Sequence, residues 1–588
     1  QPMEETAVPP ISFGRNPGST VVMQNPAVSR DHALIQLHGN QLMLIDQDSR
    51  SGTLLNGQQV QQAAINSGDT IQIVDVTYNV MSAQSGAAAD ATQLFIASDP
   101  PATLIFSEDT VHILPSAVFA AAAQPERRSF PPPIFDQAIV PMAALRQTGF
   151  PVEETTYLAI GGGLGSFVWV DHLLCYGADP SQIVSIGFEE KPYGRYRRLC
   201  KNSQIPDFER LRSNSASCPD NIWGWPGYAV REMWHDLRTG NVGHAAKLAY
   251  QIFGEPTLYE TYTPKAGNVF DSVDREAERI NWKNIWRYGR VKTIRKTDDG
   301  RYVAAYSQSG QRGGAKYALI VAPYLHVAIG YPALRFLKDL QEYREKTGDF
   351  KSVVNAYEPH EHVYDQLRKK GGTVLIRGRG IVSSRIIQRL YELRLDGANV
   401  SILHLNRTPL AEGARYLRAS RQIDNHWEFQ PFNWPKAGWG GDLRLVLEQA
   451  SDAERGRLLK QWGGTTTAAR TDWRDIIRDG LREGWYEIEF GSVKSVDKQD
   501  GHVVTHIEKK NVSGTVDLLA DFIIDGTGLE ADVDSHPLLK DIIDTYGLRR
   551  NSSNRLFVSN DFGMVGMENG SGRMYSSGAM TLGGPYAP

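Results

Sequence analysis

The amino-acid sequence predicts a multidomain protein in which a small all-β domain precedes a larger α/β body. The chain has 588 residues, which is more than a single hydrophobic core organises. Short apolar runs alternate with turn residues between positions 11 and 82, as in a β-sandwich. Two successions of strand, glycine loop, helix and strand begin at positions 157 and 373. Such successions are typical of parallel sheets covered by helices.

Composition and charge exclude several classes of protein. Hydrophobic residues make up 41% of the chain and charged residues 22%, as in ordinary globular proteins. The formal net charge of −4 gives no electrostatic reason to expect binding to nucleic acid or to an anionic membrane. No apolar run is long enough to span a bilayer. The three cysteines and the missing metal-ligand spacings predict a cytoplasmic protein with neither a disulfide framework nor a metal site.

The first 82 residues form the predicted β-sandwich. Its apolar runs, at 33–35 and 42–45, are separated by glycine-containing turns. Glycine, polar and basic residues follow one another in and beside the turns in this order: Gly14, Arg15, Ser29, Arg30, His32, Arg50, Ser51, Gly52, Thr53 and Asn56. Their order and spacing resemble the pattern of the forkhead-associated (FHA) domain.

The resemblance implies an FHA domain over residues 1–82 that binds a phosphothreonine-containing protein. Guanidinium and hydroxyl donors suit a phosphate group, which carries nearly two negative charges. Carried over by position, Arg15 and Ser29 hold the phosphate, Arg30 lies beside it, and Arg50 and Ser51 face the peptide. The family usually has Asn where this chain has Ser51, so docking without phosphate stays open as an alternative.

Residues 83–152 have the composition of a linker. Alanine runs and the Pro131, Pro132 and Pro133 sequence are typical of connecting segments. A short pair of strands is expected within it, at 103–106 and 110–114.

The first α/β unit has the parts of a dinucleotide-binding site. A strand at 157–160 leads into the glycine loop 161–166, and a helix and a second strand follow. Glycine allows the tight turn, and the bare N–H groups at the start of a helix can bind a pyrophosphate. Glu189 ends the second strand and can accept a hydrogen bond from a ribose. The candidate residues are Gly161, Gly162, Gly163, Leu164, Gly165, Ser166 and Glu189.

The alternative for this stretch is an ordinary strand–turn–helix whose glycine-rich loop binds no cofactor. Ser166 occupies the sixth position of the motif, where glycine is usual, and this substitution weakens the match.

The second unit repeats the pattern between 373 and 405. Gly378, Gly380 and Ser383 occupy its loop, and Arg407 follows the second strand in place of an acid. A guanidinium suits a 2′-phosphate, so this unit is predicted to prefer NADPH to NADH. Arg415 and Arg418 are candidates to assist. Two such units in one chain are a stronger signal than one.

The remaining segments connect these units. Hairpins are expected at 291–306 and 493–507, and charged helices at 442–484. Strands at 327–332 and 521–529 resemble crossings between domains, and Asp561 follows a late strand.

Together these segments resemble the FAD- and NADPH-binding flavoproteins, nearest in layout to flavin-containing and N-hydroxylating monooxygenases. The resemblance implies a Rossmann-like FAD-binding domain at 153–338 and 515–588, with an NADPH-binding domain inserted at 371–510. It implies that Asp561 holds the ribityl chain of FAD, although Asn560 stands where the family has glycine. The Phe-x-Gly-x-x-x-His fingerprint of some relatives is absent, so no catalytic side chain is assigned.

Two functions fit these observations. The first is an NADPH-dependent FAD oxidoreductase of monooxygenase type, which acts on a small molecule and is recruited to a phosphothreonine-bearing partner. The second is a catalytically weak or inactive scaffold that acts through its FHA domain within a larger assembly. A homo-oligomer is compatible with both.

Overall fold

The computed structural model describes most of residues 11–82, the strand at 102–106, and most of residues 129–585. Excluded within these ranges are residues 17–18, 20, 24–27, 39–40, 57, 66–68, 75, 212–224, 259–263, 309–315, 417–418, 431–441, 464–465, 469, 511–512 and 531. The chain divides into two compact units, Gln1–Arg128 with Ser309–Lys316, and Ser129–Gln308 with Tyr317–Pro588. No helix in the described ranges combines the length and apolar character that crossing a membrane requires.

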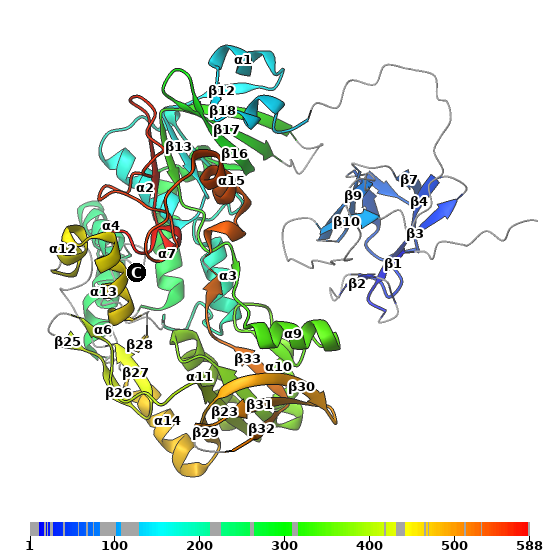
Figure 1. Cartoon of the computed structure of the whole chain (residues 1–588), viewed down its shortest axis with the longest axis vertical. Helices are drawn as coiled ribbons and strands as arrows, with labels where there is room; N and C mark the ends of the chain where they lie inside the picture. Colours follow the sequence, from blue (N-terminus) through cyan, green and yellow to red (C-terminus); the bar gives the residue numbers. More distant parts are fainter. Residues whose placement is uncertain are drawn as a thin grey trace, which may run out of the picture. The chain divides into compact units, whose positions relative to one another are not determined.

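The smaller unit is a sandwich of two five-stranded sheets, ordered β2-β1-β3-β4-β7 and β10-β9-β8-β5-β6 (Figure 1). Phe13, Ile35, Leu44, Ile71 and Ile73 are among the buried side chains of its core. The strands are β1 Ile11–Gly14, β2 Val21–Val22, β3 Ala33–His38, β4 Gln41–Asp46, β5 Thr53–Leu55, β6 Gln58–Val60, β7 Gln62–Ile65, β8 Thr70–Ile73, β9 Val76–Ser82 and β10 Ala102–Phe106. The predicted all-β domain is confirmed.

The structure differs from the predicted linker at 83–152 in two respects. Strand β10 lies in the predicted linker and pairs in parallel with β9, whereas the strand expected at 110–114 lies outside the described residues. The larger unit starts at Ser129, so the last part of the 83–152 segment belongs to it.

The first half of the larger unit is a parallel sheet with the order β15-β14-β13-β19-β35. Its strands are β13 Tyr157–Ile160, β14 Ile183–Gly187, β15 Trp286–Tyr288, β19 Tyr324–Val327 and β35 Arg573–Ser576. This is the 3-2-1-4-5 order of dinucleotide-binding sheets, in which ligands bind where the strand order reverses, at the carboxyl ends of the strands.

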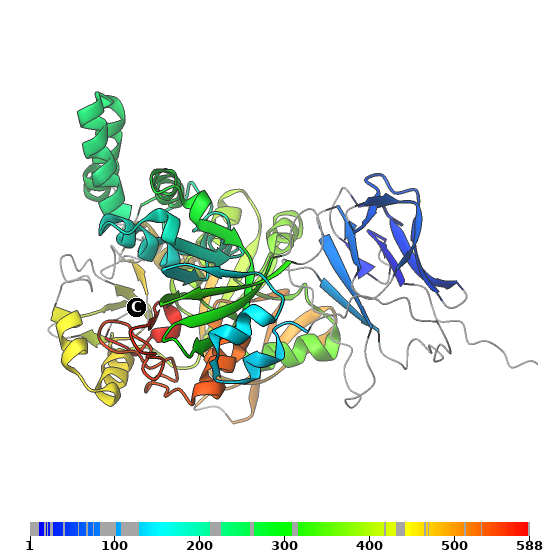
Figure 2. The ribbon, with the colours of Figure 1, turned by 90° about the horizontal axis from the view of Figure 1, so that it is seen from above.

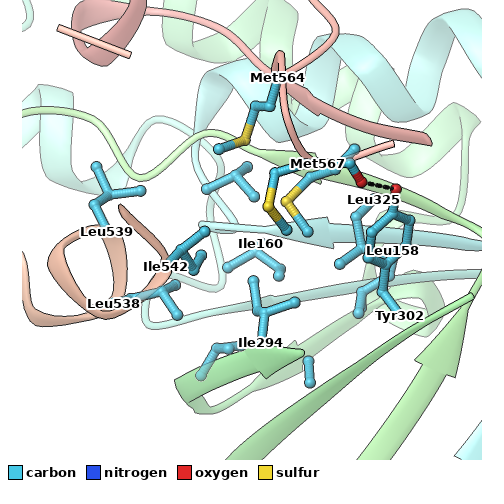
Figure 3. Packing of buried hydrophobic residues seen from close by; sticks show 14 of the residues in the cluster. Leu158, Ile160, Ile294, Tyr302, Leu325, Leu538, Leu539, Ile542, Met564 and Met567 are labelled. Carbon is cyan, nitrogen blue, oxygen red and sulfur yellow. Dashed lines mark hydrogen bonds between the residues drawn. The ribbon is translucent and has the colours of Figure 1, made fainter. Parts of the chain in front are cut away.

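An apolar core joins this sheet to the C-terminal segments. Leu158, Ile160 and Leu325 from the sheet pack against Leu539 of helix α15 and Met567 in the cluster drawn in Figure 3. Helix α15 spans Pro537–Tyr546. The last part of the chain is therefore an integral part of this core.

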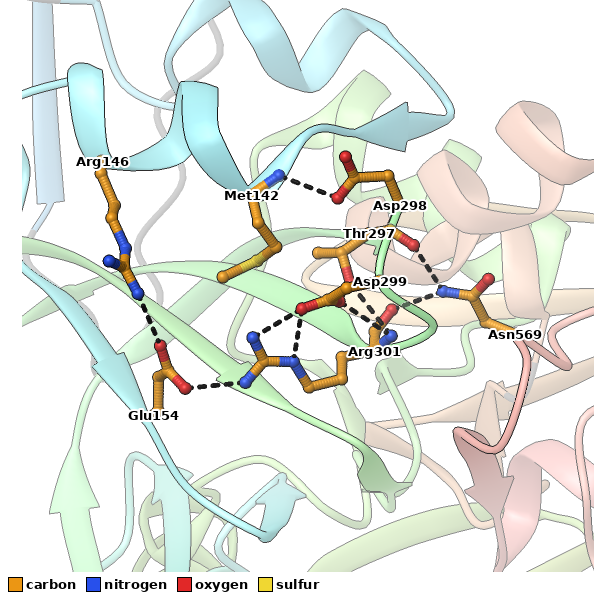
Figure 4. A network of polar contacts seen from close by, with 8 residues as sticks. All are labelled: Met142, Arg146, Glu154, Thr297, Asp298, Asp299, Arg301 and Asn569. Atoms are coloured by element: carbon orange, nitrogen blue, oxygen red, sulfur yellow. Dashed lines mark hydrogen bonds and ion pairs between the residues drawn. The ribbon is translucent and has the colours of Figure 1, made fainter.

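A mixed sheet, ordered β11-β16-β17-β18-β12, packs beside the first sheet, and its edge strands β11 and β12 pair in parallel with β16 and β18. Its strands are β11 Ile139–Val140, β12 Val152–Glu154, β16 Arg290–Thr297, β17 Tyr302–Gln308 and β18 Lys316–Ala322. The β16–β17 turn is fixed by polar contacts from three segments: Asp298 accepts from the Met142 N–H, Arg301 pairs with Glu154, and Asn569 donates to backbone carbonyls (Figure 4). The predicted hairpin at 291–306 is confirmed.

Helices fill the intervals of the first half. They are α1 Met142–Gln147, α2 Leu164–Cys175, α3 Gly194–Asn202, α4 Trp225–Thr239, α5 Val242–Ala249, α6 Glu255–Leu258, α7 Ala266–Arg279 and α8 Trp282–Ile285, with a π-helix at Tyr250–Gly254. The α4–α5 pair projects from the body in Figure 2.

The second half repeats the plan of the first. Its parallel sheet is ordered β21-β33-β22-β23-β29, and the three-stranded antiparallel sheet β30-β31-β32 lies between β29 and β33 along the chain. The strands are β21 Val353–Asn355, β22 Gly372–Arg377, β23 Val400–Asn406, β29 Tyr486–Phe490, β30 Ser492–Gln499, β31 His502–Glu508, β32 Thr515–Ala520 and β33 Phe522–Asp525. The helices are α9 Lys338–Thr347, α10 Glu361–Lys370, α11 Ile381–Leu395 and α14 Thr471–Glu483.

Two short strands form the crossings between the halves. Strand β20 (Ala333–Leu334) leads into the second half, strand β34 (Leu529–Glu530) leads out of it, and the two pair antiparallel. Between β23 and β29 the chain also forms β24 Arg415–Tyr416, β25 Ala419–Ser420, β26 Gln422–Asp424, β27 Trp427–Gln430, α12 Asp442–Gln449, α13 Asp452–Trp462 and β28 Thr467–Ala468. The predicted α/β fold class is confirmed.

Candidate functional site

The first glycine loop is pressed against the neighbouring strand ends. Gly161 has φ of +132°, and a Cβ there would lie 2.1 Å from the Ala328 carbonyl oxygen. Gly162 has φ of +60°, and its Cβ would lie 2.8 Å from the Cα of Gly187. Both positions therefore require glycine. A Cβ at Gly163, in contrast, would have no neighbour closer than 3.9 Å, so the loop is open on that side.

Helix α2 begins at Leu164 directly after this loop. Its N-cap residue, Gly163, provides no side-chain hydrogen bond, so the N–H groups of the first turn are not satisfied by a cap. Gly165 packs against Ala328, where an added Cβ would lie 3.1 Å from the Ala328 Cβ. Ser166 is fully buried, and its hydroxyl has no hydrogen-bond partner among the described residues. Ser166 thus lies on the packed side of the helix, away from the open side of the loop.

Glu189 lies just beyond the carboxyl end of β14 and is half-buried. Arg198 on α3 donates a 2.6 Å hydrogen bond to its Oε1 atom. A carboxylate accepts several hydrogen bonds, so the pair with Arg198 leaves capacity for a hydroxyl donor.

Asp561 lies in an exposed turn between Ser559 and Gly563. Its Oδ1 atom accepts hydrogen bonds from the Ser559 hydroxyl and, at 3.3 Å, from the Gly563 N–H. The hydrogen bond from Ser559 holds the pKa of Asp561 below its usual value. This side chain is therefore an ionised acceptor near neutral pH.

The second loop has the same construction. Gly378 has φ of +100°, and a Cβ there would lie 2.7 Å from the Gly526 carbonyl oxygen. A Cβ at Gly380 would meet nothing within 4 Å, and Gly380 caps helix α11 without a side-chain hydrogen bond. Ser383 is fully buried beside Gly526 and, like Ser166, has a hydroxyl with no partner among the described residues. Both loops thus present an open helix start above a tightly packed base.

Arg407 follows β23 and is exposed, with no hydrogen bond or ion pair to any other described residue. Arg379, in the loop itself, donates to the carbonyl oxygen of Thr408 at 3.2 Å and to that of His426 at 3.4 Å. Sequence reasoning missed Arg379, although it stands between the two motif glycines. Arg415 pairs with Glu412 at 3.7 Å, and Arg418 lies outside the described residues.

A series of buried side chains linked by hydrogen bonds lies beneath the second loop. The Nε2 atom of His404 lies 2.8 Å from the Gly378 carbonyl oxygen, and its Nδ1 atom lies 2.7 Å from the Tyr486 hydroxyl. The indole N–H of Trp427 donates to the same hydroxyl at 2.9 Å. Sequence reasoning missed this series. The signal was a histidine between the apolar residues Leu403 and Leu405 of strand β23.

Helices α12 and α13 lie against the Asp561 turn. Arg455 donates to the Asn560 side-chain oxygen at 2.8 Å, and the Asn560 amide donates to the Glu448 carbonyl at 3.2 Å. The Ser552 hydroxyl donates to the Asp452 carbonyl at 2.7 Å. The segment inserted in the second half therefore contacts the C-terminal part of the first half.

In the sandwich, the predicted phosphate-binding loops meet at Ser29. Its hydroxyl accepts a 2.9 Å hydrogen bond from the Arg50 N–H, and its carbonyl accepts from the Arg15 N–H at 3.0 Å. Arg15, Arg30, Arg50 and Ser51 are all exposed. The structure therefore brings the predicted residues to one group of loops.

The framework of these loops is buried. His32 accepts from the Ser29 N–H at its Nδ1 atom, at 3.0 Å, so its Nε2 atom donates to the Gly52 carbonyl oxygen at 3.2 Å. A Cβ at Gly14 would lie 2.0 Å from the Arg30 carbonyl oxygen. Asn56 accepts from the Thr70 N–H at 2.9 Å. These three residues hold the loops in place.

The comparisons with known proteins divide along the same two units. Residues 11–74 match the family model of the FHA domain, which confirms that resemblance. The glycogen accumulation regulator GarA of Mycolicibacterium smegmatis is 37% identical over 65 residues, which are 11% of this chain and 41% of that protein. GarA of Mycobacterium tuberculosis H37Rv is 37% identical over 62 residues, or 38% of its length. The chain thus spans less than half of the length of these curated relatives.

Solved structures resemble the larger unit. DfoA from Erwinia amylovora, a cadaverine monooxygenase bound to FAD, has a TM-score of 0.52 and 12% identity, over 73% of this chain and 90% of that one. The ornithine N-hydroxylase KtzI from Kutzneria sp. 744, with reduced FAD, NADP⁺ and L-ornithine, has a TM-score of 0.51 and 12% identity, over 73% and 94%. At this identity the likeness shows a shared fold, and the predicted flavoprotein monooxygenase fold is confirmed at that level.

Proposed function

We propose that this chain, an FHA domain followed by the fold of flavin-dependent N-hydroxylases, is an NADPH-dependent FAD oxidoreductase of monooxygenase type. The observation that carries the proposal is the duplicated loop. Gly161 and Gly378 both require glycine, whereas Gly163 and Gly380 both open onto an uncapped helix start. A phosphate bound there accepts from N–H groups that the fold leaves without a cap. The residues present therefore fit two dinucleotides.

In this proposal FAD binds the first loop and NADPH the second. Glu189 accepts from the ribose hydroxyls of FAD, and Asp561 accepts from its ribityl chain. Arg407 pairs with the 2′-phosphate of NADPH, with Arg379 beside it. Bound flavin supplies the hydride acceptor and the oxygen chemistry. The chain's own groups bind and orient the two cofactors, and buried Ser166 and Ser383 support the helices that carry the loops.

The substrate class follows from the neighbours of the fold. DfoA is described as acting on cadaverine and KtzI as acting on ornithine, and both compounds carry a primary amine on an alkyl chain. We therefore propose small alkyl amines as the first substrates to test.

The FHA domain adds a recruiting function. Ser29, Arg15 and Arg50 meet in one group of loops, with Arg30 and Ser51 exposed beside them. Hydroxyl and guanidinium donors in that arrangement suit a phosphothreonine on a partner protein. The proposal is that this contact brings the oxidoreductase to a phosphorylated partner.

The test is an absorption spectrum of the purified chain, repeated after anaerobic addition of NADPH. Flavin bands that bleach with NADPH, and more slowly with NADH, are the expected result. Flavin bands that persist with both donors would instead favour the scaffold function. A protein that holds no flavin even after reconstitution with FAD would refute the assignment of the first loop.

A further inference from the structure

We propose that His404 is a positioning residue for NADPH, because it fixes the peptide between Gly378 and Arg379 so that its N–H faces the cofactor. The inference rests on the proposed function of the second loop. It goes beyond the glycine motif, since His404 lies on strand β23 and does not itself reach the open side.

Donor chemistry fixes the direction of each hydrogen bond that links Trp427, Tyr486 and His404 to the loop. The indole N–H of Trp427 can only donate, so the Tyr486 oxygen accepts from it at 2.9 Å. The Tyr486 proton is then available for the His404 Nδ1 atom at 2.7 Å. A neutral imidazole that accepts at Nδ1 carries its hydrogen on Nε2. His404 therefore donates to the Gly378 carbonyl oxygen at 2.8 Å.

Burial keeps this arrangement in one protonation state. His404 and Tyr486 are each 1% exposed, and Trp427 is fully buried. Burial, with a smaller contribution from the nearby Arg379 charge, lowers the pKa of His404 to about 4. The imidazole is thus neutral near pH 7, and its tautomer is set by Tyr486.

The hydrogen bond to Gly378 determines where the next N–H points. In a planar trans peptide the C=O and N–H bonds point in opposite directions. Because the Gly378 carbonyl points to His404, the Arg379 N–H points away from the imidazole. The N–H groups of Arg379 and Gly380 form no hydrogen bond with any described residue, and the space at Gly380 is open to 4 Å. Two adjacent donors are therefore left for a phosphate oxygen.

The first loop is held differently. His404 is in register with Ile376, two residues before Gly378, and the equivalent position opposite Ala159 in the first sheet is Ser185. The Ser185 hydroxyl is buried with no partner among the described residues, so it does not hold the loop. There the backbone of Gly187 packs against the Gly161 carbonyl, where an added Cβ would lie 2.7 Å from the oxygen. Loss of His404 is thus expected to affect NADPH and leave FAD unaffected.

The test compares His404→Leu, His404→Gln and Tyr486→Phe in the full-length, FAD-loaded protein. The measurement is the Kd of NADP⁺ by titration calorimetry. The leucine removes the donor to Gly378, so its Kd is expected to rise about 10-fold, the equivalent of one hydrogen bond. The glutamine keeps an N–H donor and is expected to recover part of that loss. In steady-state assays the KM for NADPH is expected to rise more than kcat falls.

A matched control is available in the same domain. His360 and Tyr364 form a second buried histidine–tyrosine pair, with 2.9 Å between Nε2 and the hydroxyl, and the other ring nitrogen of His360 bonds to the Glu358 carbonyl oxygen, outside the glycine loop. His360→Gln and Tyr364→Phe report the effect of disturbing the domain core alone. They are expected to leave the Kd of NADP⁺ within about 2-fold of wild type, consistent with the absence of a lost loop contact.

The outcomes separate this inference from the proposed function. His404→Leu and Tyr486→Phe proteins that bind NADP⁺ as tightly as wild type would overturn only the inference. Equal losses in the His360 and His404 variants would do the same. A wild-type protein that holds FAD but binds no NADP⁺ would overturn the proposed function and the inference together. If the leucine variant does not fold, Tyr486→Phe, which removes one oxygen atom, decides the question.

Discussion

The guanidinium of Arg455 donates a 2.8 Å hydrogen bond to the side-chain oxygen of Asn560, which lies 105 positions further along the chain. Arg455 is itself buried on α13, and Asn560 also donates to the Glu448 carbonyl. Asn560 stands at the position where the flavoprotein pattern that the sequence resembles has glycine. Its side chain thus has a structural function here, since it joins the inserted helices to the turn that carries Asp561.

This contact predicts the effect of Asn560→Gly. The change leaves one Nη2 hydrogen of buried Arg455 without its side-chain acceptor, which costs about 1–2 kcal/mol. Amide hydrogen exchange in residues 442–462 is expected to become faster, with little change elsewhere. Asn554→Gly is the control, because Asn554 has φ of +57°, a conformation that glycine adopts without strain. Faster exchange in both variants would contradict the assignment.

The open glycines predict a separation of folding from cofactor binding. Gly163→Ala and Gly380→Ala place a methyl group in open space, so the melting temperature is expected to change by less than about 3 °C. The same methyl groups occupy the approach of a pyrophosphate, so the first variant is expected to lose FAD and the second to lose NADPH.

Two further glycine variants serve as controls, one expected to be neutral and one expected to disrupt the fold. Gly243→Ala, also in open space but on α5, is expected to change neither cofactor. Gly161→Ala is expected to unfold the first half, because its Cβ would lie 2.1 Å from a carbonyl oxygen. Normal cofactor content in the Gly163 and Gly380 variants would refute the loop assignments.

Arg407→Ala tests the preference for NADPH. Loss of a guanidinium–phosphate contact costs roughly 1.5–3 kcal/mol, or about 10- to 100-fold in Kd. The Kd of NADP⁺, measured by titration calorimetry, is expected to rise by that factor while the Kd of NAD⁺ stays nearly constant. Arg478→Ala, which removes an exposed arginine on α14 that is paired with Asp475, is the control. An equal loss of affinity for NADP⁺ and NAD⁺ would show that Arg407 does not bind the 2′-phosphate.

Ser29→Ala tests the sandwich loops. The hydroxyl accepts from the Arg50 N–H, and in the proposal it also donates to phosphate. Its removal is expected to weaken binding of a phosphothreonine peptide at least about 10-fold by calorimetry. Asn56→Ala, at a framework position, is expected to lower the melting temperature and leave the peptide Kd nearly unchanged. If the unphosphorylated peptide binds equally well to wild type, the domain docks without phosphate.

Two buried histidines predict how stability depends on pH. Burial lowers the pKa values of His326 and His404 to about 4, from about 6.5 in the unfolded chain. Above pH 6.5 both imidazoles are neutral in the folded and in the unfolded protein. Between pH 6.5 and 4 only the unfolded state binds the protons, so the folded state loses stability as the pH falls. Each histidine contributes a slope of roughly 1.4 kcal/mol per pH unit in that window.

Urea unfolding between pH 7.5 and 4.5 measures this slope. His404→Gln and His326→Gln are each expected to reduce the dependence of the free energy of unfolding on pH. A free energy of unfolding that stays constant or rises toward pH 4.5 would contradict the prediction.

The sequence was sufficient for the fold because its strongest signals are local. Gly161 and Gly378 mark turns that only glycine can form, and the strands before them and the helices after them follow at the expected spacing. The residues that hold the FHA loops, such as His32 and Asn56, stand in a fixed order for the same reason. These features depend on neighbours in the chain and are therefore visible without a structure.

The parts that escaped prediction depend on contacts between distant segments. His404 acts beneath Gly378 only because β22 and β23 pair in one register, and Tyr486 comes from a strand 82 positions later. In the sequence Asn560 is only a departure from a motif, and its structural function becomes visible through its hydrogen bond with the distant Arg455. The inward position of Ser166 and Ser383 likewise follows from helix packing, which a six-residue motif does not reveal.

The antiparallel pairing of β20 with β34 has a consequence for how such a chain can arise. The polypeptide enters the second half at Leu334 and leaves it at Leu529, and these two residues are partners in the same two-stranded sheet. A nested domain whose ends already touch can be added to a host, or removed from it, through a single junction, without spreading the host strands apart. The second half can therefore be gained or lost as one continuous segment, through a single junction at the paired residues Leu334 and Leu529.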